Sequence, residues 1–220
     1  MFKIRKLLGG LIVTNFEIRK MSRELLGGTF YRREWLVPAL CLGVIDAIVA
    51  LLSSLLFGLG GLLVAGPVLV STTYFLLNKM RTKKPFEPRD LLKGVEDDLL
   101  ANVSLGFQIA VYTFLWSLLF IMPGIVKSYA YAMAGYIKND NPDLTSAACI
   151  AESQNLMHGN KMKLFLLDIS FIGWYLLGAL CFGVGVFLVL PYHQMARTIF
   201  YESLVGDPSN IYIDEDVYNA

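Results

Sequence analysis

The chain has 220 residues and a net charge of +1; 55% of its residues are hydrophobic and only 17% are charged. A soluble domain of this length has roughly 25% charged residues, so the composition argues against an ordinary water-soluble protein. No run of basic residues is interleaved with aromatic ones, so nothing indicates a nucleic-acid partner.

Residues 1–35 are strongly basic and contain eight of the nineteen Lys and Arg residues. Ile18, Met21, Leu25 and Leu26 recur between these charges at helical spacing. The pattern is typical of an amphipathic helix that lies on an anionic membrane surface. It predicts a basic N-terminal segment that precedes the apolar part of the chain.

The first predicted hairpin covers residues 36–80. Two apolar stretches, 36–57 and 62–77, are joined by a glycine-rich turn at 58–61. A helix needs about 20 apolar residues to cross a hydrocarbon core of roughly 30 Å. We therefore expect each stretch to be a membrane-spanning helix.

The second predicted hairpin covers residues 101–137 and follows a short amphipathic surface helix at 87–100. Pro123 and Gly124 divide it into two apolar helices. The second helix, 123–137, is short for a full crossing of the bilayer. We expect it to tilt, to thin the bilayer locally or to pack inside the bundle.

The third predicted hairpin covers residues 162–204 and also follows a surface helix, at 144–158. Asp143 or Thr145 is the expected N-cap of that surface helix. The last stretch, 206–220, is acidic and is predicted to be a loose tail.

A proline lies near the start of the second helix of each predicted hairpin, namely Pro67, Pro123 and Pro191. Proline fits the first turn of a helix because the N–H that it lacks has no partner there in any case. We expect each proline to open a helix, which makes the three hairpins a weak internal repeat.

These elements predict an all-α, polytopic integral membrane protein with about six transmembrane helices in three hairpins. The hairpins would form one domain over residues 36–205, with an amphipathic surface segment before each. With six spans and a cytoplasmic N-terminus, seventeen of the nineteen Lys and Arg residues lie on the cytoplasmic side. The three outer turns carry no charge, so the positive-inside rule places both termini in the cytoplasm.

Several charged or titratable side chains interrupt the apolar stretches. A charge in lipid costs roughly 2.5–3.5 kcal/mol on insertion scales, so such groups are expected to have partners. Asp168 and Arg197 lie at similar depths on adjacent predicted helices, which predicts an ion pair between them. Lys127, near an outer helix end, is expected to extend toward the membrane surface.

Two roles are open for the polar groups inside the predicted bundle. They either converge on a shared polar interior that carries a substrate or protons, or only hydrogen-bond the helices to one another. The candidates for a polar interior are Asp46, Lys127, Tyr131, Asp168, His193 and Arg197.

No catalytic motif is present, and the histidines His158 and His193 occur in unrelated contexts. The three cysteines are widely spaced, as expected of small core residues rather than of a disulfide framework or metal site. The sequence therefore predicts no enzymatic activity, no cofactor and no metal.

Several stretches together resemble domain of unknown function 975, a bacterial family of multi-pass membrane proteins. The resemblance implies a location in the bacterial cytoplasmic membrane and supplies no catalytic residue. The stretches that carry it are WSLLFIMPGIVKSYAYAMAGYI (116–137), DNPDLT (140–145), AESQNLMHGNKMKLFLLDISFIGWYLLGAL (151–180), LPYHQMARTIFYESL (190–204) and IRKMSRELLGG (18–28).

Two functions are compatible with this sequence. The first is a non-enzymatic scaffold, regulator or accessory subunit whose cytoplasmic segments contact the bilayer or a protein partner. The second is a small permease-like protein that moves an amphiphile, ion or peptide through a polar interior. A water-filled pocket lined by Tyr131, His193 and Arg197 would favour the permease, and a dry interior would favour the scaffold.

Overall fold

The computed structural model describes residues 15–26, 33–55, 59–82, 88–96, 98–119, 121–180 and 184–206. Within these ranges every regular element is helical, which confirms the predicted all-α class. The elements are α2 (Asn15–Leu25), α3 (Arg33–Leu55), α4 (Leu59–Thr82), the 3₁₀ turn η1 (Pro88–Leu92), α5 (Lys93–Glu96), α6 (Leu99–Leu119), α7 (Ile121–Tyr131), α8 (Ala134–Asp140), α9 (Ser146–Leu156), α10 (Lys161–Leu180) and α11 (Val184–Val205). The predictions for 1–14 and for the tail 207–220 lie outside the described residues.

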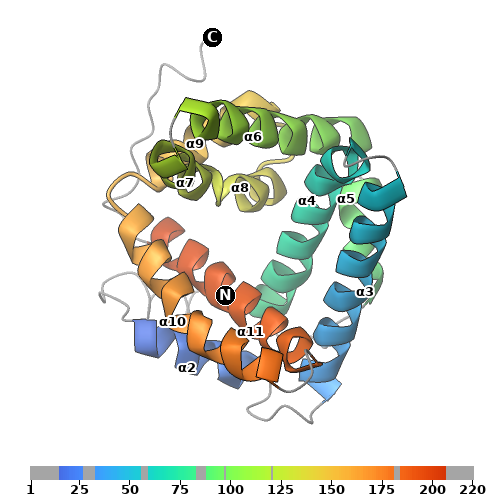
Figure 1. Ribbon diagram of the computed structural model, residues 1–220, viewed down its shortest axis with the longest axis vertical. Helices are drawn as coiled ribbons and strands as arrows, with labels where there is room; N and C mark the ends of the chain where they lie inside the picture. Colours follow the sequence, from blue (N-terminus) through green and yellow to red (C-terminus); the bar gives the residue numbers. More distant parts are fainter. Residues whose placement is uncertain are drawn as a thin grey trace.

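The three predicted hairpins correspond to the pairs α3–α4, α6–α7 and α10–α11, and the two helices of each pair pack against each other (Figure 1). Some boundaries differ from the predictions. Residues 59–61, expected in a turn, already belong to α4. The surface helix expected at 87–100 is a 3₁₀ turn followed by the short helix α5. The helix expected at 144–158 is α9, whose N-cap Thr145 accepts a hydrogen bond from the backbone N–H of Ala148.

The helix predicted over 123–137 is broken into α7 and α8, with a turn at Ala132 and Met133. Ser153 of α9 is inserted at this break: its hydroxyl accepts from the Met133 N–H at 3.2 Å and donates to the Ala130 carbonyl at 2.8 Å. The side chain thus replaces backbone hydrogen bonds that a continuous helix would make. At 1.5 Å per residue α7 is roughly 17 Å long, about half of a hydrocarbon core.

The prediction that each proline opens a helix is wrong at two of three positions. Pro67 and Pro191 lie inside α4 and α11, and only Pro123 lies in the first turn of its helix. An internal proline cannot donate to the carbonyl four residues earlier. The two helices nevertheless continue for several turns beyond their prolines, so the three hairpins are less alike than the sequence indicates.

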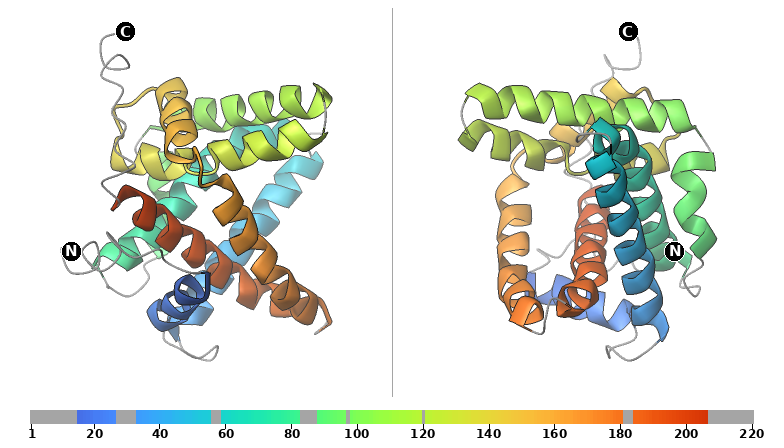
Figure 2. Two further views of the ribbon diagram at one scale, coloured as in Figure 1. Left: turned by 90° about the vertical axis from the view of Figure 1, so that its left-hand side faces the viewer. Right: turned by 45° about the vertical axis from the view of Figure 1, so that its right-hand side comes forward.

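The α6–α7 hairpin lies across one end of the other two hairpins rather than beside them (Figures 1 and 2). Helix α6 packs on α4, and α3, α4, α10 and α11 form the sides of a ring below it (Figure 1).

The contact between α4 and α6 is a close backbone approach at two glycines. A Cβ atom added to Gly66 would overlap the carbonyl of Asn102 and approach the backbone nitrogen of Gly106 at 2.9 Å. A Cβ added to Gly106 would likewise overlap the backbone of Gly66. Small residues at a helix crossing permit this separation, as is common where helices pack without a hydrophobic driving force between them.

The outer faces of the long helices are apolar. Residues Leu99–Leu118 and Lys161–Leu180 form helices long and apolar enough to cross a membrane, and only 17% and 22% of these windows are buried. By length and composition alone, these are the two such helices among the described residues. The core helix of a soluble protein would instead be mostly buried.

The apolar face of helix α2 is buried against the rest of the protein. Ile18 and Leu26 are buried in the core, and the helix packs on α11 and α10. The expectation that this face rests on lipid is therefore not what the structure shows. Arg19, Lys20 and Arg23 remain on the parts of α2 that are partly or fully exposed.

Candidate functional site

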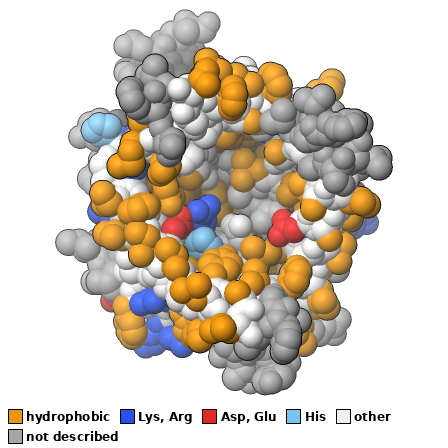
Figure 3. Space-filling view, viewed as in Figure 1, with side chains coloured by type: hydrophobic (Ala, Val, Ile, Leu, Met, Phe, Trp, Pro, Cys, Tyr) orange, Lys and Arg blue, Asp and Glu red, His pale blue; other side chains and the backbone are white. Residues whose placement is uncertain are grey.

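A cavity of about 250 Å³ lies in the middle of the ring of helices, and we call it the central cavity. Hydrophobic side chains surround it, and acidic, basic and histidine side chains lie within it (Figure 3). Four helices and the α7–α8 turn supply its walls. The lining residues are Leu42 and Asp46 of α3, Ala65, Val68, Leu69, Thr72 and Thr73 of α4, Ala132, Tyr136 of α8, and Leu190, Gln194 and Arg197 of α11.

Arg197 connects the central cavity to a polar cluster centred on Asp168 of α10. Its Nη2 lies 2.5 Å from Asp168 Oδ2 and its Nε lies 3.1 Å from Oδ1. The predicted Asp168–Arg197 ion pair is thus confirmed, with the bidentate geometry that a guanidinium favours. The Asp168 carboxylate is mostly buried, with 12% of its side chain exposed.

Two further side chains bond to the same carboxylate. His193 Nε2 lies 2.8 Å from Asp168 Oδ1, and the Tyr129 hydroxyl donates to Oδ2 at 3.0 Å. The Tyr175 hydroxyl lies 3.0 Å from the other ring nitrogen of His193. The neutral tautomer that suits this arrangement donates from Nε2 to Asp168 and accepts at Nδ1 from Tyr175.

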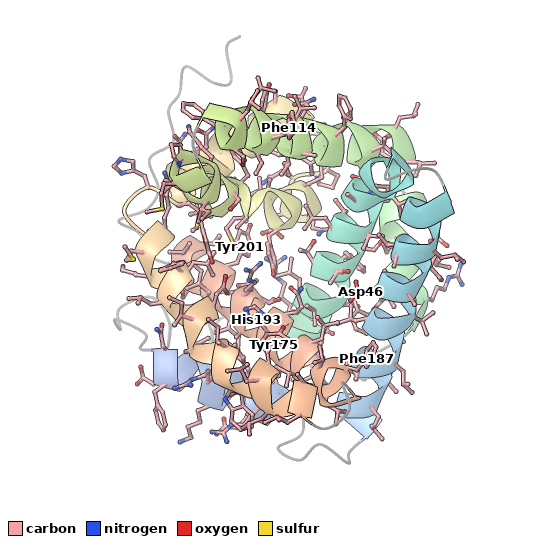
Figure 4. All side chains as sticks on the ribbon, viewed as in Figure 1. Asp46, Phe114, Tyr175, Phe187, His193 and Tyr201 are labelled. Carbon is pink, nitrogen blue, oxygen red and sulfur yellow. The ribbon has the colours of Figure 1, made fainter. Side chains whose placement is uncertain are left out.

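Asp46 lies on the α3 side of the ring, across from His193 and Tyr175 (Figure 4). Its side chain faces the central cavity, and it forms no hydrogen bond or ion pair with any other described residue. It therefore differs from Asp168, whose charge is balanced by Arg197. Among the residues that the structure describes, the cavity thus has a carboxylate without a counter-charge on one wall and an ion pair on the opposite wall.

Lys127 and Tyr131, predicted to share the polar interior, lie elsewhere. Lys127 Nζ donates to Gln154 Oε1 at 3.2 Å and sits 4.8 Å from the centre of the Trp116 ring. Tyr131 is buried, with its ring 6.3 Å from that of Tyr112. Lys127 thus contacts α6 and α9, Tyr131 contacts α6, and neither residue lines the central cavity. The expectation that Lys127 extends toward the membrane surface stays a prediction.

Tyr129 and Tyr175 of the Asp168 cluster were not among the candidates predicted from the sequence. The position of Tyr175 relative to Asp168 could have indicated it. Tyr175 is seven residues after Asp168, and Arg197 is four after His193, so each pair shares one helix face. Tyr129 had no such signal because it comes from a third helix.

A second polar cluster joins the ends of α4, α8 and α11 by hydrogen bonds and ion pairs. The Arg81 guanidinium bonds to Asp140 at 2.5 and 2.9 Å and to Glu202 at 2.6 Å, while the Tyr201 hydroxyl donates to Asp140 at 2.8 Å. Hydrogen bonding to Asp140 raises the pKa of Arg81 above its usual range, so this group stays charged.

These features define an all-helical protein with apolar outer faces and polar groups gathered on the inside. Residues 121–207, which run from α7 to just beyond α11, match the family model described as Protein of unknown function (DUF975), and this match supports the family resemblance predicted from the sequence. The similar stretch noted at 18–28 lies outside the match. Neither the curated proteins nor the solved structures contain a match to this chain.

Proposed function

We propose that the protein is a multi-pass membrane protein that takes up a small polar solute into the central cavity, in the manner of a permease. The observation that carries this proposal is the pairing of an apolar exterior with a polar interior cavity. Of the two functions compatible with the sequence, a conduit is the one that needs such a cavity.

The exterior supports a lipid environment. Large apolar side chains stand exposed along α6 and α10, among them Phe114 at 65%, Leu118 at 77% and Leu180 at 80%. Soluble monomers rarely expose contiguous apolar patches larger than a few hundred Å². Lipid tails would cover these apolar faces, so that they would not be exposed to water.

The topology in this proposal has six spans and both termini in the cytoplasm of a bacterial cell, and its support is the distribution of Lys and Arg. Helix α6 lies across α10 in the structure (Figure 2). No single bilayer normal follows both helices in that arrangement. The proposed six-span topology therefore rests on the distribution of Lys and Arg alone, and the orientation of α6 counts against it.

A scaffold remains the second candidate, and the two polar clusters favour it. The Asp168 and Arg81 clusters each bond side chains from three helices, which is what a rigid framework requires. We propose no enzymatic activity in either case, because the sequence contains no catalytic motif.

Cysteine accessibility separates the candidates. Starting from a variant without native cysteines, Thr72→Cys and Gln194→Cys place thiols in the cavity, and Ile169→Cys places one on the exposed face of α10. A membrane-impermeant, water-soluble thiol reagent, applied to the purified protein in lipid nanodiscs, should label the two cavity positions and leave Ile169→Cys unmodified. Labelling of Ile169→Cys alone would indicate a water-exposed exterior, and labelling of none would indicate a dry scaffold.

A further inference from the structure

We propose that Asp46 is the counter-ion for an organic ammonium group on the solute bound in the central cavity. This inference rests on the proposed function and adds the chemical class of the solute. It is argued from the balance of charges around the cavity and from the nature of its walls.

The charge balance favours a cation. Arg197, the basic residue of the lining, already directs its guanidinium to both oxygens of Asp168. The Asp46 carboxylate has no such partner among the described residues. Its wall of the cavity therefore carries one uncompensated negative charge, which attracts a cation more strongly in this partly desolvated site than in bulk water.

The walls favour an organic cation over a metal ion. Ca²⁺ takes six to eight oxygen ligands and Mg²⁺ six. The cavity lining offers a single carboxylate, Asp46, and its other side-chain oxygens are the neutral ones of threonine, glutamine and tyrosine. Most of the remaining lining is aliphatic, from Leu42, Val68, Leu69 and Leu190. A carboxylate set among aliphatic groups suits an ammonium group with an apolar part.

The size of the cavity also limits the solute. Pockets for drug-sized ligands occupy roughly 300–1,000 Å³, and the central cavity, at about 250 Å³, is smaller than that range. It fits a small amine and excludes a peptide of several residues. Of the solutes that the sequence left open, an amphiphilic cation is the one that matches both the size and the charge.

The test uses the Gln194→Cys variant, in the full chain in nanodiscs, and two methanethiosulfonate reagents of similar size. One carries a trimethylammonium group and the other a sulfonate group, and each rate is normalised to that of a small free thiol. We expect the cationic reagent to be favoured, and Asp46→Asn to lower the ratio of the two rates by about tenfold. Asp46→Glu should retain the preference, which separates loss of charge from misfolding.

Glu152→Gln is the matched control, since it removes an exposed carboxylate from α9, outside the lining of the cavity; its rate ratio should equal that of the parent. Tetramethylammonium should slow the labelling of Gln194→Cys, and potassium at the same concentration should not. An equal ratio in Asp46→Asn and its parent, or equal protection by potassium, would overturn the inference while leaving the cavity in place. No labelling at all would instead refute the proposed function.

Discussion

Asp168 is the residue on which the interior polar groups depend. It lies on α10 and accepts hydrogen bonds from Tyr129 on α7 and from His193 and Arg197 on α11. A carboxylate with this many donors is well satisfied, and each donor would lose its partner if the carboxylate were removed. The cluster around the ion pair therefore connects three helices, whereas the pair predicted from the sequence connects two.

At this scale we predict that Asp168→Asn destabilises the protein by about 3–5 kcal/mol, because it leaves the Arg197 guanidinium without its counter-charge. The measurement is the loss of folded protein with temperature, followed in detergent. Asp143→Asn, an exposed position before α9, is the control and should change little.

The charge-reversed double variant gives a stricter test of the same pair. Asp168→Arg should lower the amount of protein in the membrane, and adding Arg197→Asp should restore part of it. Restoration should be incomplete, because His193 and Tyr129 would then face a guanidinium instead of a carboxylate. A double variant no better than Asp168→Arg alone would show that the pair does not stabilise the fold.

Among the elements, the crossing of α4 and α6 is the contact most sensitive to side-chain size. Nothing larger than hydrogen fits at Gly66 or Gly106 without a shift of the backbone. The α10 helix offers a contrast, since Gly173 has no heavy atom within 4 Å of an added Cβ.

We therefore predict opposite effects of the same substitution at two helical glycines. Gly66→Ala should lower the melting temperature in detergent, because the methyl group forces the helices apart. Gly173→Ala should be neutral or stabilising by up to about 1 kcal/mol, the difference in helix propensity between the two residues. Equal effects at both positions would argue against a close crossing of α4 and α6.

The break between α7 and α8 shows how another element decides where a helix ends. Residues 121–140 contain no glycine or proline at the break itself, where the sequence reads Ala132–Met133. The break coincides with the Ser153 hydroxyl, which bonds across it from twenty or more residues along the chain. Local propensity cannot report an interaction of this kind.

At the scale of the whole molecule, the position of the termini tests the membrane proposal. We expect a reporter fused to the C-terminus to give a cytoplasmic signal: a fluorescent protein should fluoresce, and a phosphatase should stay inactive. A phosphatase inserted near residue 183, between α10 and α11, should be active because that turn is expected outside. A C-terminal phosphatase that is active would rule out the proposed six-span arrangement.

The sequence predicted only part of the architecture of the whole molecule. Composition and apolar periodicity predicted the helical class and located the three hairpins, because these follow from local chemistry. The Asp168–Arg197 pair was also predictable, because two adjacent antiparallel helices bring residues of equal depth together. Lys127 and Tyr131 do not line the central cavity, because the direction in which α7 faces depends on its packing against α6 and α9.

The amino-acid sequence by itself determined that the chain is helical and apolar on the outside, and which side chains would need partners. The reason is that helix formation and the cost of an unpaired charge depend on neighbours along the chain and on the solvent. Only the tertiary structure decided that Asp168 is paired, that Asp46 has no partner among the described residues, and that a cavity lies between them. Those outcomes depend on distances between helices, which no local pattern of residues specifies.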